Sequence, residues 1–186
     1  PEGGAYEWSG ILLQDHMGIG KGLNAAAATT FSLAMIASRL LGDRAFEKWG
    51  HVNTVKYGGY IGGGLWGIGL LIGIPLSESH KTLGLITVCI GFAAAGFGMG
   101  PFFPAFNLAA ASIPGIAPSV GLARVGLIAI AAYFGGPTII GLIAEITSLP
   151  VAFAFPVLLY MVVGLQSKYI KVREIGRASC RERVSS

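Results

Sequence analysis

Charged side chains are scarce in this sequence. Asp, Glu, Lys and Arg make up 12% of its 186 residues, whereas an average soluble domain has roughly 25%. Hydrophobic residues account for 53% and the mean hydropathy is +0.68. A soluble fold of this length could not bury that much apolar surface. The net charge of +4 is small and scattered, which argues against nucleic-acid binding. The composition therefore predicts a membrane protein.

Cysteine is also scarce: the sequence has two, Cys89 and Cys180. The chain therefore has no disulfide framework. The three histidines, His16, His51 and His80, all fall in predicted loops. The sequence contains no Walker-type phosphate-binding loop, no His/Cys ligand cluster and no readable Ser-His-Asp arrangement. We therefore expect no enzyme activity, no metal and no cofactor.

Long apolar runs divide the chain into predicted membrane-spanning helices. About 20 apolar residues are needed to cross roughly 30 Å of hydrocarbon. We interpret residues 8–14 as the end of a helix whose beginning is missing. The complete spans are expected at residues 23–41, 57–75, 83–105, 120–144 and 151–165. The predicted fold is all-α, a polytopic transmembrane bundle of five complete spans and one truncated span within residues 1–173.

Proline and glycine predict where these helices turn and pack. Residues 82–123 carry no charge but are too many for one crossing, so we place a loop at residues 111–119, which contain two prolines. Pro101 and Pro104 should bend the preceding span, and Gly135-Gly-Pro137 should interrupt the following one. Small residues at four-residue intervals predict one face for close helix packing, and the second complete span has Gly58, Gly62, Gly59, Gly63 and Gly67.

The densest cluster of charge, residues 38–51, separates the first two complete spans, and we interpret it as a tight turn at one membrane face. Because successive turns alternate between faces, this cluster shares a face with the loop at residues 111–119 and with the carboxyl end. Basic residues are enriched in cytoplasmic loops. The opposite face holds Lys21 and Lys81, whereas this face holds Arg39, Arg44, Lys48, Lys56, Lys168, Lys171 and Arg173. We therefore expect it to be cytoplasmic, with the carboxyl terminus inside the cell.

Residues 174–186 differ from the rest of the chain. Their sequence, which includes Arg-Ala-Ser-Cys-Arg-Glu-Arg-Val, resembles the translation of a common sequencing adapter. We interpret them as a non-native basic tail, expect them to be disordered, and exclude them from the fold. A natural basic tail is the alternative.

Three segments resemble the major facilitator superfamily of membrane transporters. Residues 39–44, Arg-Leu-Leu-Gly-Asp-Arg, followed by Gly50, resemble the cytoplasmic signature between the second and third helices of each six-helix half. Residues 136–145 resemble the eleventh-helix pattern of the sugar-permease-like and drug-efflux-like bacterial members, and residues 2–9 resemble their seventh helix. The order and spacing of these segments match the carboxyl-terminal half of such a transporter.

The resemblance implies secondary active transport of a small solute across the bacterial inner membrane, as a permease or an efflux protein. Substrate would bind near the bilayer midplane, between two six-helix bundles that rock to expose it to alternate sides. The expected partners are the solute, the lipid bilayer and the missing amino-terminal half. The expected coupling ion is H⁺, through Glu2 or a residue of that half. The alternatives are a non-transporting membrane scaffold and a membrane-embedded enzyme.

Polar and aromatic residues within the spans are candidates for the substrate or proton pathway. Charges inside spans are costly and usually face a bundle interior or an aqueous cavity. Glu2 and Arg124 are the charged candidates, although Arg124 could instead extend to the cytoplasmic surface. Ordinary helix packing is the alternative for the uncharged candidates. The complete set is Glu2, Asn24, Phe31, Asn107, Arg124 and Tyr133.

The expected cytoplasmic gating loop contains Arg39, Gly42, Asp43, Arg44 and Gly50. Asp43 at a helix end can accept hydrogen bonds from an arginine or from the N–H groups at the start of a neighbouring helix. Such a contact could form in one state of a transporter and break in the other. A solvated turn that only follows the distribution of basic residues is the alternative.

Overall fold

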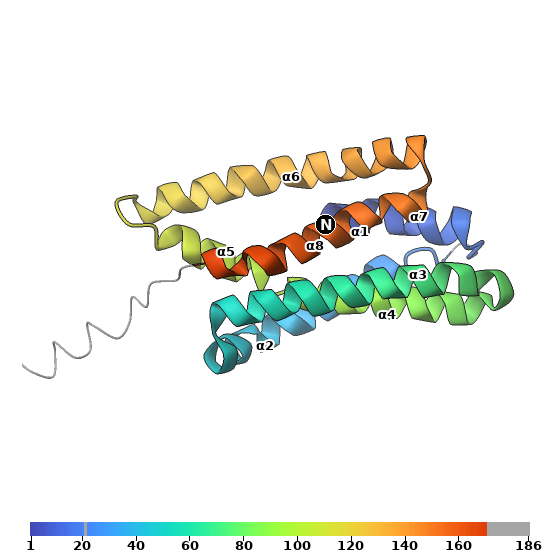
Figure 1. Cartoon of the computed structure of the whole chain (residues 1–186), viewed down its shortest axis with the longest axis horizontal. Coiled ribbons are helices and arrows are strands. Elements are labelled where there is room, and N and C mark those ends of the chain that lie inside the picture. The colour runs from blue at the N-terminus through green and yellow to red at the C-terminus, as the bar shows by residue number, and fades with distance from the viewer. Residues whose placement is uncertain (21, 171–186) are drawn as a thin grey trace, which may run out of the picture.

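The computed structural model describes residues 1–20 and 22–170, and their regular secondary structure is helical, as predicted. Figure 1 shows the long helices side by side in one bundle. Along the chain they are α1 (Glu2–Ile11), the π-helical turn η1 (Leu12–His16), α2 (Ala26–Tyr57), the π-helical turn η2 (Gly58–Gly62), α3 (Gly63–Ser79), α4 (Lys81–Met99), α5 (Phe102–Ala111), α6 (Pro118–Ile146), α7 (Leu149–Ala152), α8 (Ala154–Gln166) and the 3-10 turn η3 (Ser167–Tyr169).

Some sequence predictions fall outside the described residues. These are the non-native tail at residues 174–186, the end of the bundle at residue 173, and the basic residues Lys21, Lys171 and Arg173. The fold and the sites below therefore concern residues 1–20 and 22–170.

Within the part of the chain that the structure describes, four helical segments are long and apolar enough to cross a membrane: Ala26–Ser79, Lys81–Ala111, Pro118–Ile146 and Leu149–Tyr169. The predicted count of five complete spans and one truncated span is not confirmed by this criterion. The difference arises in the first segment, whose 54 residues count as one helix. This segment changes direction at Gly50, where φ is 75° and ψ is 162°. In Figure 1, α2 leads into this bend and α3 leads away from it.

The turn predicted at residues 38–51 is much narrower in the structure, because residues 38–49 are helical and Gly50 alone has non-helical angles. A residue with positive φ is normally glycine, which has no Cβ to clash with the backbone. The connection between α3 and α4 is equally short, because His80 is the one residue between them.

The predicted loop at residues 111–119 is confirmed between the end of α5 and the start of α6. Pro101 also separates α4 from α5, as expected. The predicted interruption at Gly135-Gly-Pro137 is wrong, because α6 continues through Pro137 to Ile146. A proline removes one backbone donor, but neighbouring groups can satisfy the helix around it in a membrane. The carbonyl that Pro137 leaves without a backbone donor is that of Tyr133, next to the Phe134 carbonyl to which Thr138 Oγ1 donates at 3.1 Å.

The glycines predicted to mark one packing face form two rows. A Cβ added to Gly62 would lie 3.1 Å from the carbonyl oxygen of Ala94 in α4. A Cβ added to Gly59 would lie 2.7 Å from both Cα and N of Gly164 in α8. Because successive residues of a helix point about 100° apart, adjacent positions start separate rows. The first row is Gly58 and Gly62, which face α4, and the second is Gly59, Gly63 and Gly67, which face α8.

Aromatic side chains fill the space between these helices. The Trp66 ring centroid lies 5.2 Å from that of Phe92, 5.9 Å from Tyr160 and 6.1 Å from Phe153, all near perpendicular. Edge-to-face pairs at this distance are favourable. The Tyr160 hydroxyl donates to the carbonyl of Ala95. The four aromatic side chains are fully buried, so this cluster is the core that joins α3, α4 and α8.

Candidate functional site

A hollow of about 490 Å³ lies between α1 and α6. The helices are fastened beside it by the indole of Trp8, whose Nε1 donates to the carbonyl of Pro137 at 3.0 Å. The exposed side chains of Glu7 and Tyr133 both line it, so the hollow combines a carboxylate, a phenol and an indole. Such a set can bind a proton or a cation and can stack on a planar or ring-shaped solute.

Glu2 begins α1 beside the middle of α6. A Cβ on the next residue, Gly3, would lie 3.0 Å from the Tyr133 carbonyl oxygen and 3.0 Å from Pro137 Cγ. Helix α6 begins at Pro118 and is about 43 Å long, and Tyr133 lies about 22 Å from its start. Tyr133 is therefore near the middle of the helix. Glu2 is half-buried at this depth. The structure therefore brings two predicted pathway residues, Glu2 and Tyr133, to the same part of the bundle.

Arg124 is not close to this pair. It lies on α6 nine residues before Tyr133, which corresponds to about 14 Å along the helix axis. Its side chain is exposed, toward the end of α6 that follows the loop at residues 111–119. Both interpretations of Arg124, as a ligand for an anionic group and as a cation that extends to the membrane surface, remain predictions.

The other predicted pathway residues occupy three separate environments. Asn24 lies just before α2, and its Nδ2 donates to Gln14 Oε1 across a long 3.4 Å. Phe31 is fully buried and packs edge-to-face on Tyr6, with ring centroids 5.7 Å apart. Asn107 is half-buried on α5. Phe31 thus has the packing environment that was the alternative to a pathway role, and contact of any of the three with a solute remains a prediction.

The predicted gating-loop residues lie on α2 and at its bend. Arg39, Asp43 and Arg44 are exposed, Gly42 is buried, and Gly50 supplies the change of direction. A role of these residues in gating remains a prediction. Within residues 1–20 and 22–170, no group of three or more His, Cys, Asp or Glu side chains is placed to hold a metal ion.

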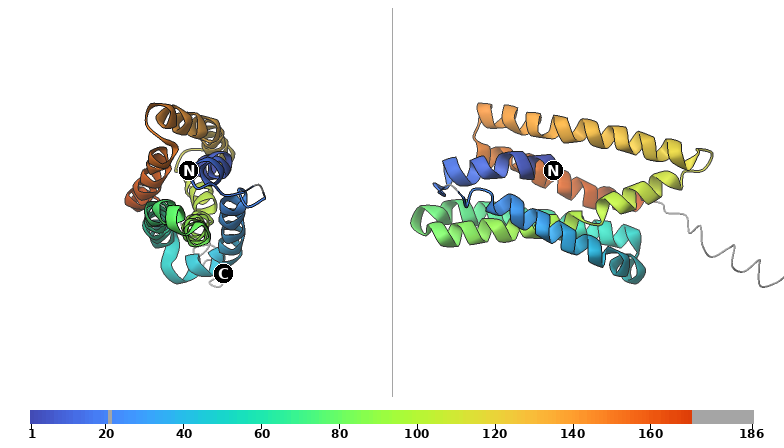
Figure 2. Two further views of the ribbon diagram at one scale, coloured as in Figure 1. Left: turned by 90° about the vertical axis from the view of Figure 1, so that its right-hand side faces the viewer. Right: turned by 180° about the vertical axis from the view of Figure 1, so that it is seen from behind.

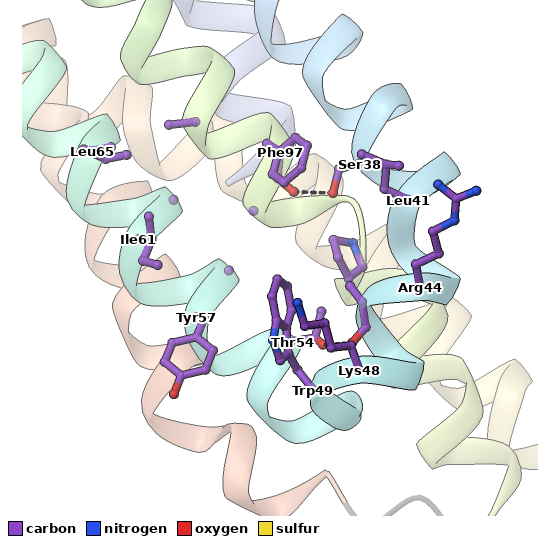
Figure 3. Close-up of a pocket in the computed structure, with 16 residues that line it drawn as sticks. Ser38, Leu41, Arg44, Lys48, Trp49, Thr54, Tyr57, Ile61, Leu65 and Phe97 are labelled. Carbon is purple, nitrogen blue, oxygen red and sulfur yellow. Dashed lines mark hydrogen bonds between the residues drawn. The ribbon is translucent and has the colours of Figure 1, made fainter.

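Sequence reasoning missed a second hollow, of about 770 Å³, beside the bend at Gly50 (Figure 3). Trp49, Tyr57 and Phe97 line it together with the basic residues Arg44 and Lys48. The juxtaposition of aromatic and basic residues on both sides of Gly50 was the signal that could have found it.

Comparison with known proteins shows a consistent set of relatives. The chain is 29% identical to an uncharacterized MFS-type transporter of Yersinia pestis over 170 residues, and this aligned region is 91% of the chain. It is 30% identical over 172 residues to an uncharacterized transporter of Sinorhizobium fredii, and 27% identical over 176 residues to the membrane protein MosC of Rhizobium meliloti. The chain is a homologue of major facilitator superfamily transporters.

The resemblance of the three sequence segments to the major facilitator superfamily is therefore confirmed. The chain spans 41% of the length of each of the three relatives. No family model matches it, and no solved structure matches it. Its apolar helices and its relatives together support a multi-pass membrane protein.

Proposed function

We propose that this chain forms the carboxyl-terminal half of a secondary active transporter, which moves a small solute by alternating access. The relatives are more than twice as long as the chain, which leaves room for a second bundle of similar size. In this proposal the Ala26–Ser79 segment crosses the membrane twice, because it reverses at Gly50. The basic residues around Gly50 then lie at the cytoplasmic face.

The hollow between α1 and α6 carries the proposal. A carboxylate and a phenol at the surface of helices this apolar are costly in lipid unless they face water or another polar group. Glu2 lies beside the middle of α6, and a transporter of this type would bind its solute near the middle of the membrane. We propose that Glu2, Glu7 and Tyr133 line the pathway, with Glu2 as the group that exchanges H⁺.

The exposed surface of α6 supports a partner bundle. Within its most apolar stretch, 6% of the residues are buried, compared with 39%, 44% and 33% in the other three segments. The helix packs mainly on α1, α5 and α7, and Figure 2 shows it along one edge of the bundle. We propose that the amino-terminal half covers part of this surface and closes the pathway between the two halves.

Water access to Tyr133 tests the proposal. The full-length gene product, with its native cysteines replaced by serine, would carry Tyr133→Cys and be reconstituted in vesicles. Alternating access predicts that a membrane-impermeant thiol reagent labels this position from either side of the membrane. A matched control is Leu71→Cys, because Leu71 is 77% exposed on the apolar surface of α3 and should face lipid.

A scaffold without a pathway predicts equal and weak labelling at the two positions, and that result would refute transport through this hollow. Movement of solute is then measured in the same vesicles, as hexose uptake or as ethidium extrusion. These probes represent the sugar-permease-like and drug-efflux-like classes. A Glu2→Gln variant should lose dependence on a proton gradient, whereas Glu145→Gln, at the exposed end of α6, should retain it.

A further inference from the structure

The 770 Å³ hollow beside Gly50 is a groove with walls from three helices. Figure 3 shows α2 on one side and α3 on the other, with α4 behind them. Leu41 belongs to the α2 wall, Ile61 and Leu65 stand along the opposite wall, and Phe97 comes from α4. This groove is separate from the α1–α6 hollow and shares no lining residue with it.

The walls of the groove are suited to hydrocarbon. Leu41, Ile61 and Phe97 are 44%, 57% and 49% exposed, so large apolar surfaces stand open inside it. The two aliphatic hydroxyl groups of the lining, those of Ser38 and Thr54, are already engaged as donors. Ser38 Oγ donates to the carbonyl of Phe97 at 2.5 Å, and Thr54 Oγ1 donates to the carbonyl of Gly50 at 2.8 Å. A polar solute would therefore find few hydrogen-bonding partners along the walls.

The end of the groove near Gly50 is cationic and aromatic. Arg44 and Lys48 line it, and Lys48 Nζ lies 5.5 Å from the centre of the Trp49 ring. Trp49 and Tyr57 are each 52% exposed there, and such residues gather at the level of lipid headgroups. Among the residues that the structure describes, no acidic residue lines the groove: Asp43 and Glu47 are exposed on α2 and are not part of the lining.

We propose that the groove binds one anionic phospholipid, with its phosphate at Arg44 and Lys48 and an acyl chain along Ile61 and Leu65. Basic pockets between transmembrane helices bind anionic headgroups. From Tyr57 to Leu65 the wall is about 12 Å long, which fits within one leaflet of a hydrocarbon core of about 30 Å. A polypeptide segment would instead have to bury both cations, at a high desolvation cost.

Lipid retention by the purified full-length protein tests this inference without any measurement of transport. The protein is incubated with an equimolar mixture of phosphatidylglycerol and phosphatidylcholine, and the retained lipids are counted by native mass spectrometry. The wild type should retain one phosphatidylglycerol in preference to phosphatidylcholine. The Arg44→Gln/Lys48→Gln variant should lose this preference by roughly 30-fold, because each basic residue near an anionic headgroup contributes on the order of a fivefold affinity.

The matched control is Arg39→Gln/Lys56→Gln. Like the test variant, it removes two positive charges from the same end of the bundle. Arg39 and Lys56 are exposed but do not line the groove. The control should retain phosphatidylglycerol as the wild type does. An equal loss in both double variants would overturn the proposal, because it would show a general effect of charge. Equal retention of the two lipids by the wild type would also overturn it.

A photoreactive residue at Ile61 identifies the occupant directly, even if a double variant fails to fold. The proposal predicts an adduct with phospholipid in native membranes. An adduct with another segment of the full-length protein would show that polypeptide fills the groove, and would overturn the inference while leaving the transporter proposal intact.

Discussion

The contact between Gly59 and α8 makes a sharp prediction about stability. A Cβ at Gly59 would lie 2.7 Å from Gly164 Cα and 3.0 Å from the carbonyl oxygen of Tyr160. Carbon atoms in contact are ordinarily 3.5–4.0 Å apart, so η2 and α8 would have to separate by about 1 Å. Both neighbouring atoms belong to the main chain, and no rotamer change can relieve the overlap. Overpacking of this kind costs about 1–3 kcal/mol.

The comparison with Gly64 separates this overlap from the general effect of alanine in a helix. A Cβ at Gly64 would lie 3.6 Å from Cε of Met161, which is an ordinary contact with the flexible end of a side chain. Gly64→Ala should therefore gain up to about 1 kcal/mol from helix propensity. Gly59→Ala gains the same term but loses more to the overlap, so we expect it to be less stable than Gly64→Ala by about 1–3 kcal/mol.

Thermal unfolding of the full-length protein in detergent, followed by tryptophan fluorescence, measures this difference. Trp66 is a suitable reporter because it is fully buried, with its ring centroid 5.9 Å from that of Tyr160. Each kcal/mol should shift Tm by roughly 2–4 °C. If the Tm of Gly59→Ala equals or exceeds the Tm of Gly64→Ala, the described close approach of η2 to α8 is wrong.

Three further predictions concern the bend, the core and the orientation. Gly50→Ala should destabilise the protein by about 1–3 kcal/mol, because its φ of 75° and ψ of 162° lie in a region that is essentially restricted to glycine. Gly42→Ala, with open space around it in α2, should be neutral or stabilising, and equal Tm values for the two variants would refute the bend at Gly50. Tyr160→Phe should cost about 0.6 kcal/mol through loss of the hydrogen bond to Ala95, and an unchanged Tm would contradict that bond. In cells, Lys48→Cys in a cysteine-free background should react with an impermeant thiol reagent only after the membrane is opened, and labelling of intact cells would reverse the proposed orientation.

The helices could be predicted from sequence because proline or charged residues next to each apolar run mark where that run ends. The loop between α5 and α6 and the break at Pro101 were predicted from proline. Gly135-Gly-Pro137 shows the limit of that reasoning, because α6 continues through Pro137 to Ile146. Local sequence also placed the turn near Gly50 without showing that one residue makes it.

The sites depended on neighbours that are distant in sequence. The depth of Glu2 follows from the contact of Gly3 with Tyr133 and Pro137, more than a hundred residues later. The aromatic and basic residues around Gly50 are a local signal for one end of the groove, but its walls required the relative positions of three helices. Phe31 could be recognised as aromatic and apolar, but its complete burial against Tyr6 depends on how α1 approaches α2.

The glycine-to-glycine approaches also limit how this sequence can vary. A Cβ at Gly69 would lie 2.9 Å from Gly91 Cα, and a Cβ at Gly59 would meet Gly164 in the same way. In a core of interlocking side chains, a larger residue on one helix can be accommodated by a smaller one opposite. Here the opposing surface is already bare main chain, so no second substitution can restore the fit. A substitution at these glycines cannot be compensated by a second substitution on the facing helix. We therefore expect sequence variation at other positions of the bundle.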